Sequence, residues 1–590
     1  MWFYINIFEY PKLLPYTLFI YFLNLIFFGF TKRYLISKSF IILSCLTLFT
    51  ILVIYYNIFN NLVIEHLNFY FTATNFTQNI GLIDFNISFQ LNTLTYLFSL
   101  LVFLIGFCTN MYALNYFKNE ADEMGFLFWL NSFILSMVIL ILASNFFTLF
   151  LGWELIGLTS FFLINFWQSR RATLKSSFKA FSFNLVSDIF LLSSFIVLYS
   201  NLHTTSIMTT NNLIAGSGVL YGSWLNLATL LLILCASIKS VQLLGHLWLP
   251  DSMEAPVPAS SLIHSATLVS AGVFLLLRFN SLITATHFEH ILIYWGALTA
   301  AYGGIVAAAQ TDMKKLLAYS TMSHCGFLFV LVGIGDYYIT IIYLFLHGLF
   351  KASTFFCVGS FVRFYATQDT RLMGGASRLL WADTIYLILC SANLCGLPLT
   401  IGITYKLFFF KALFAGNFTL LQIGLLYIAL LSSIAYFYRL LAYCLFDRWK
   451  YLWANSPFMF LVFYNRHYKD KRIPLYRTQR NDSHIVTFGH WCAIFIVMLF
   501  SFYTYFILYY FNLTAIKDYN LINSLHLQSN LLTSYLSSFY TNYLIFFYLF
   551  YIVIFIIISL FTWKKNFFYY DKLFFYLYIP ISLFFLIFNF

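Results

Sequence analysis

Residues 125–167 read GFLFWLNSFILSMVILILASNFFTLFLGWELIGLTSFFLINFW, and Glu154 is the only charged residue in this stretch. A helix needs about 20 apolar residues to cross the hydrocarbon core of a bilayer, which is about 30 Å thick. The stretch is long enough for two such helices, near 125–143 and 145–167. Transmembrane β-barrels need strands of alternating hydrophobicity, and continuous apolar runs of this length exclude them. The sequence therefore predicts a helical membrane protein.

The rest of the chain has the same character. Of its 590 residues, 62% are hydrophobic and 9% are charged, whereas an ordinary globular domain is about 25% charged. We count about sixteen candidate spans by the length criterion, which predicts an all-α polytopic membrane protein. Besides the two already given, the spans lie near 14–30, 39–57, 89–113, 178–200, 224–249, 257–279, 291–309, 313–334, 338–362, 382–410, 418–446, 486–513, 541–563 and 573–590.

The net charge of +12 reflects membrane topology rather than nucleic-acid binding. Most of the 32 lysines and arginines lie in loops that follow odd-numbered spans. An excess of Lys and Arg marks the cytoplasmic or matrix side of a membrane. No Lys/Arg block is interleaved with aromatic residues on a polar background, as a nucleic-acid surface would require. The loops on the other side contain only Lys12, Arg278, Lys411 and Lys517.

Five ionisable residues lie inside predicted spans: Glu154, Asp188, Lys239, Lys351 and Lys406. Each costs roughly 2.5–3.5 kcal/mol at a helix centre, so such residues usually mark a proton or ion path. The alternative is a charge near a span end that reaches the interface. That alternative fits Asp188 better than Lys239 or Lys351, which have apolar residues on both sides. Because two lone charges cost more than a close pair, we expect Glu154 and Lys239 to face each other.

Two histidines share a helix face with other polar residues. His347 and Lys351 are four residues apart, which places them on one face of a helix. In the eighth span, Ser260, His264 and Thr267 also line one face. A lone histidine in a span is as often a hydrogen-bonded packing residue as a functional one, and both interpretations stay open for His264.

Helix-breaking residues accompany two of the lysines. Lys406 follows Pro398 and Gly402, and Lys239 precedes Gly245. A lysine beside a break in two spans, five spans apart, is typical of a repeat, and a repeat with an odd number of helices must be inverted. The sequence therefore predicts discontinuous helices 7 and 12 and two inverted five-helix repeats, spans 3–7 and 8–12.

This pattern divides the chain into four segments and favours proton relay or ion conduction. No nucleophile–base triad, metal-ligand cluster or phosphate-binding glycine loop occurs in the sequence. None of the nine cysteines forms C-x-x-C, so they are interpreted as buried free thiols.

The four predicted segments are an N-terminal two-helix segment (1–88), the first repeat (89–250), the second repeat (251–413) and C-terminal helices with a basic loop at 447–484 (414–590).

Several motifs resemble one family of membrane proteins. LGWELIG at 151–157 resembles the G-W-E-x-x-G of the antiporter-like membrane subunits of respiratory complex I. LPDSMEAPVP at 249–258 and IHSAT at 263–267 resemble the chain 5 type within this family. DMKK at 312–315 and QDTRLMGG at 368–375 are similar to further stretches of the same type. The resemblance covers most of the middle of the chain.

Related subunit types fit less well. The chain 4 type carries a glutamate where this sequence has Lys406, and the chain 2 type lacks the stretch at 263–267. The large subunit of multi-subunit sodium/proton antiporters shares nearly every motif and is the main alternative.

The resemblance implies roles in a proton path for seven residues: Glu154 and Lys239 as a glutamate–lysine pair, Lys351 as the central lysine, Lys406 as the terminal lysine, Asp188 as the acid of N-R-x-x-D, and His264 and His347 as relay histidines. Three positions depart from the family pattern. Leu185 replaces the arginine of N-R-x-x-D, Tyr343 replaces a histidine found in many members, and Leu407 replaces an aspartate. The changes at Tyr343 and Leu407 leave fewer groups that can carry a proton on the route expected between Lys351 and Lys406.

The function implied by the resemblance is proton pumping coupled to NADH oxidation and ubiquinone reduction in other subunits. We expect no cofactor on this chain, with FMN, iron–sulfur clusters and ubiquinone elsewhere in the complex. The expected partners are other membrane-arm subunits, especially a chain 4 neighbour, and lipids, but no nucleic acid. The expected location is the mitochondrial inner membrane, with the basic loops on the matrix side. A second hypothesis is a scaffold subunit with an impaired channel.

The C-terminal tail is too short for the lateral helix that the family normally carries. Only residues 566–572 separate the fifteenth predicted span from the run at 573–590, and a long helix needs one residue per 1.5 Å. Either 573–590 is a final anchor, or it begins a lateral helix that a separate polypeptide completes. Under both interpretations we expect this chain to build no complete lateral helix.

Overall fold

The computed structural model describes residues 88–446 with short gaps, and a few residues before them. The gaps are 118–121, 217–221, 266, 366, 375–379, 398–399, 401, 403–405 and 407–418. The earlier described residues are 17, 20–21, 24, 47–48, 51, 69–72, 79–80 and 83–84. The first two and last three predicted spans, the basic loop and the tail therefore lie wholly or mostly outside the described residues.

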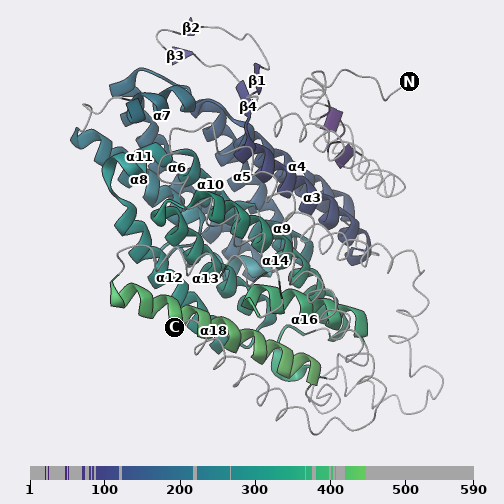
Figure 1. Ribbon diagram of the computed structural model, residues 1–590. Helices are drawn as coiled ribbons and strands as arrows, with labels where there is room; N and C mark the ends of the chain where they lie inside the picture. Colours follow the sequence, from purple (N-terminus) through teal and green to yellow (C-terminus); the bar gives the residue numbers. More distant parts are fainter. Residues whose placement is uncertain are drawn as a thin grey trace, which may run out of the picture.

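The described part is a bundle of long helices that pack side by side (Figure 1). Nine segments of the described residues are long and apolar enough to cross a membrane, and one of them, Val257–Arg278, contains two of the helices given below. The helices, with two 3₁₀ turns (η3, η4) and a π-helical turn (η5), are α3 (Thr93–Tyr116), α4 (Glu123–Leu142), α5 (Phe146–Ile164), α6 (Arg171–Leu202), α7 (Ile207–Gly216), α8 (Ser223–Lys239), η3 (Asp251–Glu254), α9 (Val257–Ser265), α10 (Leu268–Arg278), α11 (Asn280–Thr286), α12 (Glu289–Ala309), α13 (Met313–Ile334), α14 (Tyr337–Tyr365), η4 (Thr370–Leu372), α16 (Trp381–Cys395), α18 (Leu420–Leu441) and η5 (Ala442–Phe446).

The helices agree with predicted spans 3 to 13, and the short elements are additions. The short helices α7 and α11 lie in connections that the sequence did not mark. Four short strands precede α3: β1 (Phe69–Thr72) pairs antiparallel with β4 (Ser88–Leu91), and β2 (Asn79–Ile80) with β3 (Ile83–Asp84). The exact number of sixteen spans, the inverted repeats and the four-segment division stay predictions.

Connections that follow even-numbered spans meet at one end of the bundle. The backbone N–H of Ser144 donates to the Ser88 carbonyl over 3.1 Å, and that of Ile207 donates to the Ser144 carbonyl over 3.0 Å. Phe146 N–H donates to the Thr205 carbonyl over 3.0 Å. These bonds join the connections before α3, after α4 and after α6, so those helices share this end.

Connections that follow odd-numbered spans meet at the opposite end. Met313 N–H donates to the Gln368 carbonyl over 3.0 Å, and Thr370 N–H donates to the Thr311 carbonyl over 3.0 Å. The chain leaving α12 therefore contacts the chain leaving α14. The helices that run from one end of the bundle to the other must therefore alternate in direction. The charge distribution in the sequence predicted this alternation.

The chain also reaches this second end after α8. Lys179 Nζ lies 2.6 Å from a carboxylate oxygen of Asp251, which ties the first turns of α6 to η3. Lys314 Nζ donates to the Ala255 carbonyl over 3.1 Å, which ties the first turn of α13 to the residue after η3. Basic residues of two different odd-side connections thus gather around one segment.

The helix of the seventh predicted span ends at depth. α8 ends at Lys239, and residues 240–250 form turns before η3 begins. Val241 and Leu244 have positive φ angles of 61° and 78°, which are strained for side chains of this size. Gly245 allows the chain to fold back, because a Cβ there would lie 2.9 Å from the Cα of Ile238. The predicted discontinuity is confirmed, and it starts six residues earlier than Gly245.

Two further helices are interrupted. In the eighth predicted span, α9 ends at Ser265 and α10 begins at Leu268, with Thr267 in a non-helical bend that the sequence did not predict. α16 ends at Cys395, where Gly396 adopts a left-handed φ of 68°. The predicted break in the twelfth span is therefore present just before Pro398, a residue that lies outside the described residues.

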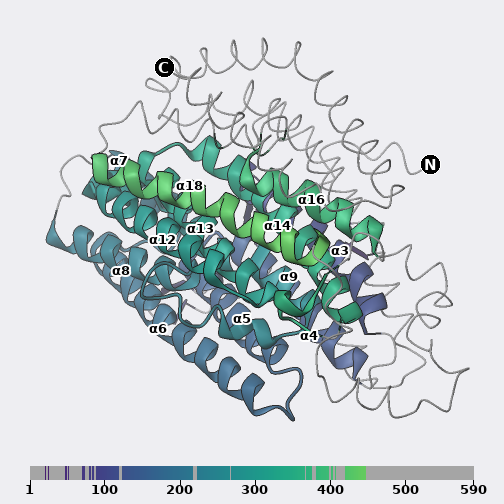
Figure 2. The same ribbon diagram turned by 90° about the horizontal axis from the view of Figure 1, so that it is seen from below.

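Glycines set the spacing of α12 and α13. A Cβ at Gly296 would lie 2.7 Å from the Gly326 carbonyl oxygen, and a Cβ at Gly303 would lie 2.8 Å from the Ser323 amide nitrogen. A Cβ at Gly333 would likewise lie 2.9 Å from a backbone oxygen of α12. Small residues allow backbones to approach closely in membrane helix pairs. α18 lies along this pair, while α6 and α8 lie at another edge of the bundle (Figure 2).

Candidate proton path

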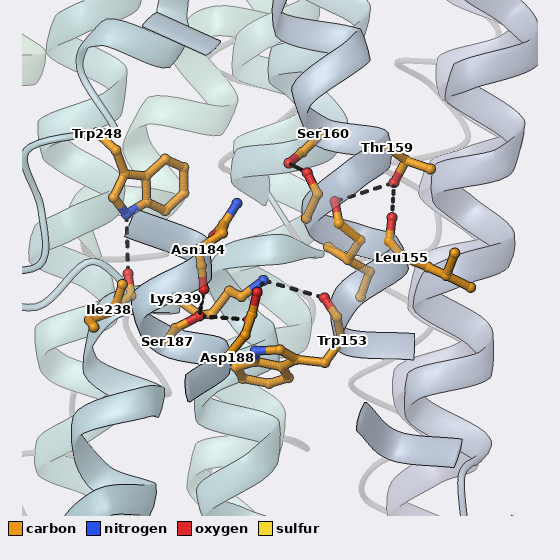
Figure 3. A network of polar contacts seen from close by, with 12 residues as sticks. Trp153, Leu155, Thr159, Ser160, Asn184, Ser187, Asp188, Ile238, Lys239 and Trp248 are labelled. Atoms are coloured by element: carbon orange, nitrogen blue, oxygen red, sulfur yellow. Dashed lines mark hydrogen bonds and ion pairs between the residues drawn. The ribbon is translucent and has the colours of Figure 1, made fainter. Parts of the chain in front are cut away.

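The Lys239 ammonium lies in a buried polar cluster between α5, α6 and α8 (Figure 3). Its Nζ is 3.9 Å from Oδ1 of Asp188 and donates to the Trp153 carbonyl over 3.4 Å. It also lies 5.1 Å from the centroid of the Trp153 ring, within reach of a cation–π interaction. Ser187 Oγ donates to Asp188 over 3.0 Å. A carboxylate, a carbonyl and an indole face thus stabilise one buried ammonium.

Asp188, rather than Glu154, is the ionic partner of Lys239. Within the described residues Glu154 has no ion pair within 4.0 Å, and its side chain is half-buried. The reason is geometric, because successive residues of a helix point about 100° apart. The Trp153 carbonyl faces Lys239, whereas α6 packs along α8 and presents Asp188. Glu154 and Lys239 interact electrostatically without an ion pair within 4.0 Å among the described residues, and the predicted facing arrangement of the two stays a prediction.

Asp188 keeps polar neighbours although this chain lacks the arginine of N-R-x-x-D. Leu185 is 42% exposed and lies on the outer face of α6, one of a row of exposed apolar side chains on that helix. An arginine there would lie one turn before Asp188, which is 5% exposed, but toward the outer face of α6. Asn184 is buried beside the cluster, and a Cβ added to Gly157 would contact both Asn184 and the Lys239 ammonium. The two buried residues of the N-R-x-x-D motif, Asn184 and Asp188, are therefore both present in the cluster.

The break after Lys239 is lined by polar contacts. Trp248 Nε1 donates to the Ile238 carbonyl over 3.2 Å, which satisfies one group that the broken helix frees. Thr299 Oγ1 of α12 donates to the Gln242 side chain over 2.6 Å. Irregular backbone at membrane depth needs such partners, because each unsatisfied group costs several kcal/mol.

His264 is completely buried in the last turn of α9. Its Nε2 lies 3.1 Å from Ser252 Oγ, and its Nδ1 has no hydrogen-bond partner among the described residues. Its ring lies 6.4 Å from the ring of Phe355 on α14. His264 therefore lies between the Lys239 break and α14, as expected for either a relay or a packing histidine.

Lys351 lies in the middle of α14 and is completely buried. Its Nζ donates a short hydrogen bond to Ser320 Oγ of α13. Among the described residues no carboxylate lies within 4.0 Å of it. A lysine held by a hydroxyl, with no counter-ion, is suited to binding and releasing a proton.

A buried histidine pair lies one turn from Lys351. The rings of His347 and His324 are 4.8 Å apart, centroid to centroid. Nδ1 of His324 lies 2.7 Å from the hydroxyl oxygen of Tyr343. The sequence interpretation missed His324, although a histidine four residues after Ser320 in an apolar helix was a usable signal.

Lys406 lies beyond the break at the end of α16. Its Nζ donates to the Cys395 carbonyl over 2.8 Å. The C-terminus of a helix carries a partial negative charge that stabilises a nearby cation. Lys239, the last residue of α8, lies at the same kind of helix end. Leu407 lies outside the described residues.

Six of the seven predicted residues are buried, and Glu154 is half-buried. The described part of the chain contains no cluster of three or more His, Cys, Asp or Glu that could hold a metal. Lysine, imidazole and hydroxyl groups exchange protons without making or breaking other bonds. The arrangement is chemically suited to proton transfer.

Two sequence profiles of known families match this chain. The profile described as NADH:quinone oxidoreductase/Mrp antiporter, TM matches residues 143–435. The profile described as NADH-Ubiquinone oxidoreductase (complex I), chain 5 N-terminus matches residues 77–127. Together the two matched ranges cover more than half of the chain, which resembles this antiporter-like family over both of them. All seven predicted residues of the antiporter-like site lie inside the first matched range.

Relatives in this antiporter-like family include NADH-ubiquinone oxidoreductase chain 5 of Paramecium tetraurelia, which is 44% identical over 61% of this chain and 65% of its own length. Chain 5 of Wickerhamomyces canadensis is 32% identical over 70% of this chain and 64% of its own length. Chain 5 of Phytophthora infestans is 34% identical over 57% of this chain and 52% of its own length. The matched region spans less than two thirds of each relative.

Two solved structures share the antiporter-like fold. The Mrp complex from Dietzia sp. DQ12-45-1b has a TM-score of 0.64 and 24% identity, and the match covers 76% of this chain and 48% of that one. The archaeal membrane-bound sulfane sulfur reductase has a TM-score of 0.67 and 16% identity. The match covers 85% of this chain and 96% of that one. Both similarities show the fold alone.

Proposed function

We propose that this chain is a proton-translocating membrane-arm subunit of respiratory complex I. In this proposal other subunits oxidise NADH, reduce ubiquinone and carry FMN and iron–sulfur clusters, while this chain moves protons through its buried lysines. The overall reaction is that of an H⁺-translocating NADH:ubiquinone reductase. The names of the relatives support the assignment to the complex.

The single observation that carries the proposal is Lys351. It is completely buried in a membrane helix, and its ammonium contacts a serine hydroxyl. A charge at a helix centre is costly and is usually kept for an ion or proton path. A scaffold subunit gains nothing from that cost, because apolar packing would hold the same helices.

The test is proton pumping by the purified complex in proteoliposomes. We expect Lys351→Ala to lower the number of protons pumped per NADH oxidised, because the central proton-binding group is removed. The matched control is Lys175→Ala, since Lys175 is exposed at the start of α6. Native gels establish that both variants assemble. An unchanged proton yield in assembled Lys351→Ala would instead support the scaffold hypothesis.

The large subunit of a sodium/proton antiporter is the second candidate. The description of the first matched profile includes both classes, which keeps this candidate open. We place it second because the relatives between 32% and 44% identical are all named chain 5. Sodium-dependent proton movement by this chain without NADH would favour the antiporter.

The location and partners follow from the same proposal. We place the chain in the mitochondrial inner membrane, with its basic odd-numbered loops on the matrix side. Its neighbours are other membrane-arm subunits, especially a chain 4 neighbour, together with lipids. A separate polypeptide that completes the lateral helix remains part of the proposal, because the tail lies outside the described residues.

A further inference from the structure

Two neighbouring helices carry matching rows of polar side chains in the interior of the bundle. Ser320 and His324 are one turn apart on α13, and Tyr343, His347 and Lys351 are each one turn apart on α14. Residues four apart share a helix face. Each of these five side chains is at most 3% exposed. The two rows are therefore one polar contact surface inside an apolar bundle.

Three contacts join the rows. Lys351 donates to Ser320, the His324 and His347 rings lie 4.8 Å apart, and His324 Nδ1 lies 2.7 Å from the Tyr343 hydroxyl. His324 thus contacts both α14 residues that precede Lys351. Because the three contacts follow one another along the two helices, polar groups are continuous from Lys351 to Tyr343.

Nε2 of His324 has no hydrogen-bond partner among the described residues, and neither does Nε2 of His347. A buried polar atom without a partner destabilises the fold, because it has lost its hydrogen bonds to water. An apolar side chain of similar size would fill the same space on α13 without that cost. The retained imidazole therefore points to a use beyond packing.

We propose that His324 is a proton-carrying residue of this path and that Tyr343 fixes its tautomer. The Tyr343 oxygen accepts the Nδ1–H of His324, which leaves Nε2 as the basic nitrogen. A hydrogen bond to one imidazole nitrogen sets the role of the other in this way. One proton passes from protonated His347 to Nε2 of His324, and no other bond changes. The path then runs on α13 as well as on α14.

This inference rests on the proposed function, and its competitor is a structural role. In that competitor the His324–Tyr343 hydrogen bond only ties α13 to α14. His324→Gln separates the two, because an amide N–H can still donate to Tyr343 but cannot take up a proton. Tyr343→Phe keeps the imidazole and removes the group that fixes its tautomer.

The experiment measures protons pumped per NADH oxidised by the whole complex in proteoliposomes. We expect His324→Gln to assemble and to lower this yield at least as far as halfway from the wild-type value to that of Lys351→Ala. Tyr343→Phe should lower it less. The control is His290→Gln, since His290 is exposed on the first turn of α12, and its yield should match the wild type.

The outcomes separate this inference from the proposed function. Normal pumping by assembled His324→Gln, with Lys351→Ala impaired, would overturn the role of His324 alone. Normal pumping by Lys351→Ala would overturn the proposed function and this inference together. If His324→Gln does not assemble, Tyr343→Phe decides, and a wild-type yield from that variant would overturn the inference.

Discussion

At the scale of single residues, Lys239 shows how this protein tolerates a charge in the bilayer. Its ammonium is 1% exposed and has a carboxylate, a carbonyl oxygen and an indole ring around it. An ammonium removed from water needs such compensation, because its desolvation costs several kcal/mol. Lys351 and Lys406 have polar neighbours but no carboxylate within 4.0 Å among the described residues. The three lysines therefore differ in how firmly each holds its proton.

The pairing predicts different effects for the two acidic residues. Asp188→Asn should destabilise the subunit by about 3–5 kcal/mol, because it leaves a buried ammonium without its counter-ion. Glu154→Gln should cost much less, since Glu154 is half-buried and makes no ion pair in the described part of the chain. The measurement is the temperature at which half of the detergent-solubilised complex has lost this subunit. Equal shifts in the two variants would contradict the pairing.

The sequence predicted the candidate site only in part. Lone charges in apolar runs identified Lys239, Lys351 and Asp188, because hydropathy alone marks them as exceptional. The partner of Lys239 could not be predicted, since it depends on the rotation of α5 and on how α6 packs along α8. His324 was missed because it follows no break and its partners lie on another helix.

At the scale of helices, cationic side chains satisfy the ends of neighbouring elements. Arg278 donates to the carbonyls of Ile141 and Ala143 at the end of α4. Arg439 of α18 donates to the Ala308 carbonyl at the end of α12. The last carbonyls of a helix have no partner within it, and they carry a partial negative charge. Arg278 and Arg439 therefore act as caps supplied by a different helix.

Arg278 provides a test of this capping. Arg278→Ala should destabilise the subunit by about 1.5–3 kcal/mol, the range for hydrogen bonds to charged groups. Arg278→Lys should lie between this variant and the wild type, because it keeps the charge but loses the second donor. The readout is the thermal midpoint of the solubilised complex. Arg171→Ala, at an exposed position, serves as the control and should not shift it.

Two glycines of α5 predict opposite results for the same substitution. A Cβ at Gly152 would lie 2.6 Å from the Leu140 backbone nitrogen, so Gly152→Ala forces α4 and α5 apart. We expect a cost of about 1–3 kcal/mol, typical of overpacking. At Gly157 the nearest atom would lie 3.7 Å away, an ordinary contact, so Gly157→Ala should be tolerated. Steady-state levels of assembled complex on native gels compare the two, and similar losses would refute this packing.

At the scale of the whole molecule, the two ends of the bundle differ in charge. The end formed by the connections after α5, α12 and α14 carries Arg170, Arg171, Lys314, Lys315 and Arg371. The opposite end carries Arg278 among the described residues. The positive-inside rule supports the proposal that the first end faces the matrix.

This orientation predicts the outcome of cysteine labelling. A membrane-impermeant maleimide should label His290→Cys in mitoplasts, where the outward face of the inner membrane is accessible. It should label Arg171→Cys only in inverted inner-membrane vesicles. Both positions are exposed, and the described native cysteines are buried or, for Cys395, half-buried. The reverse pattern would invert the topology.

The fold was more predictable than the site because lipid imposes one dominant rule. Each buried span must be a helix of roughly membrane thickness, so apolar length alone identified spans 3 to 13. Breaks were harder to predict. Gly245 marked one, but the actual start at Lys239 depends on strained Val241 and Leu244, which follow no sequence rule. Nothing in the apolar run of α9 and α10 marked their interruption.

The glycine contacts between α12 and α13 restrict the motions that can transmit a signal through this subunit. Sliding one helix by a single residue, about 1.5 Å, would bring larger side chains onto the backbone positions that Gly296 and Gly326 now face. The pair therefore moves as one stiff unit. A signal that crosses this pair therefore passes through rearranged side chains on its surface rather than through sliding of one helix along the other.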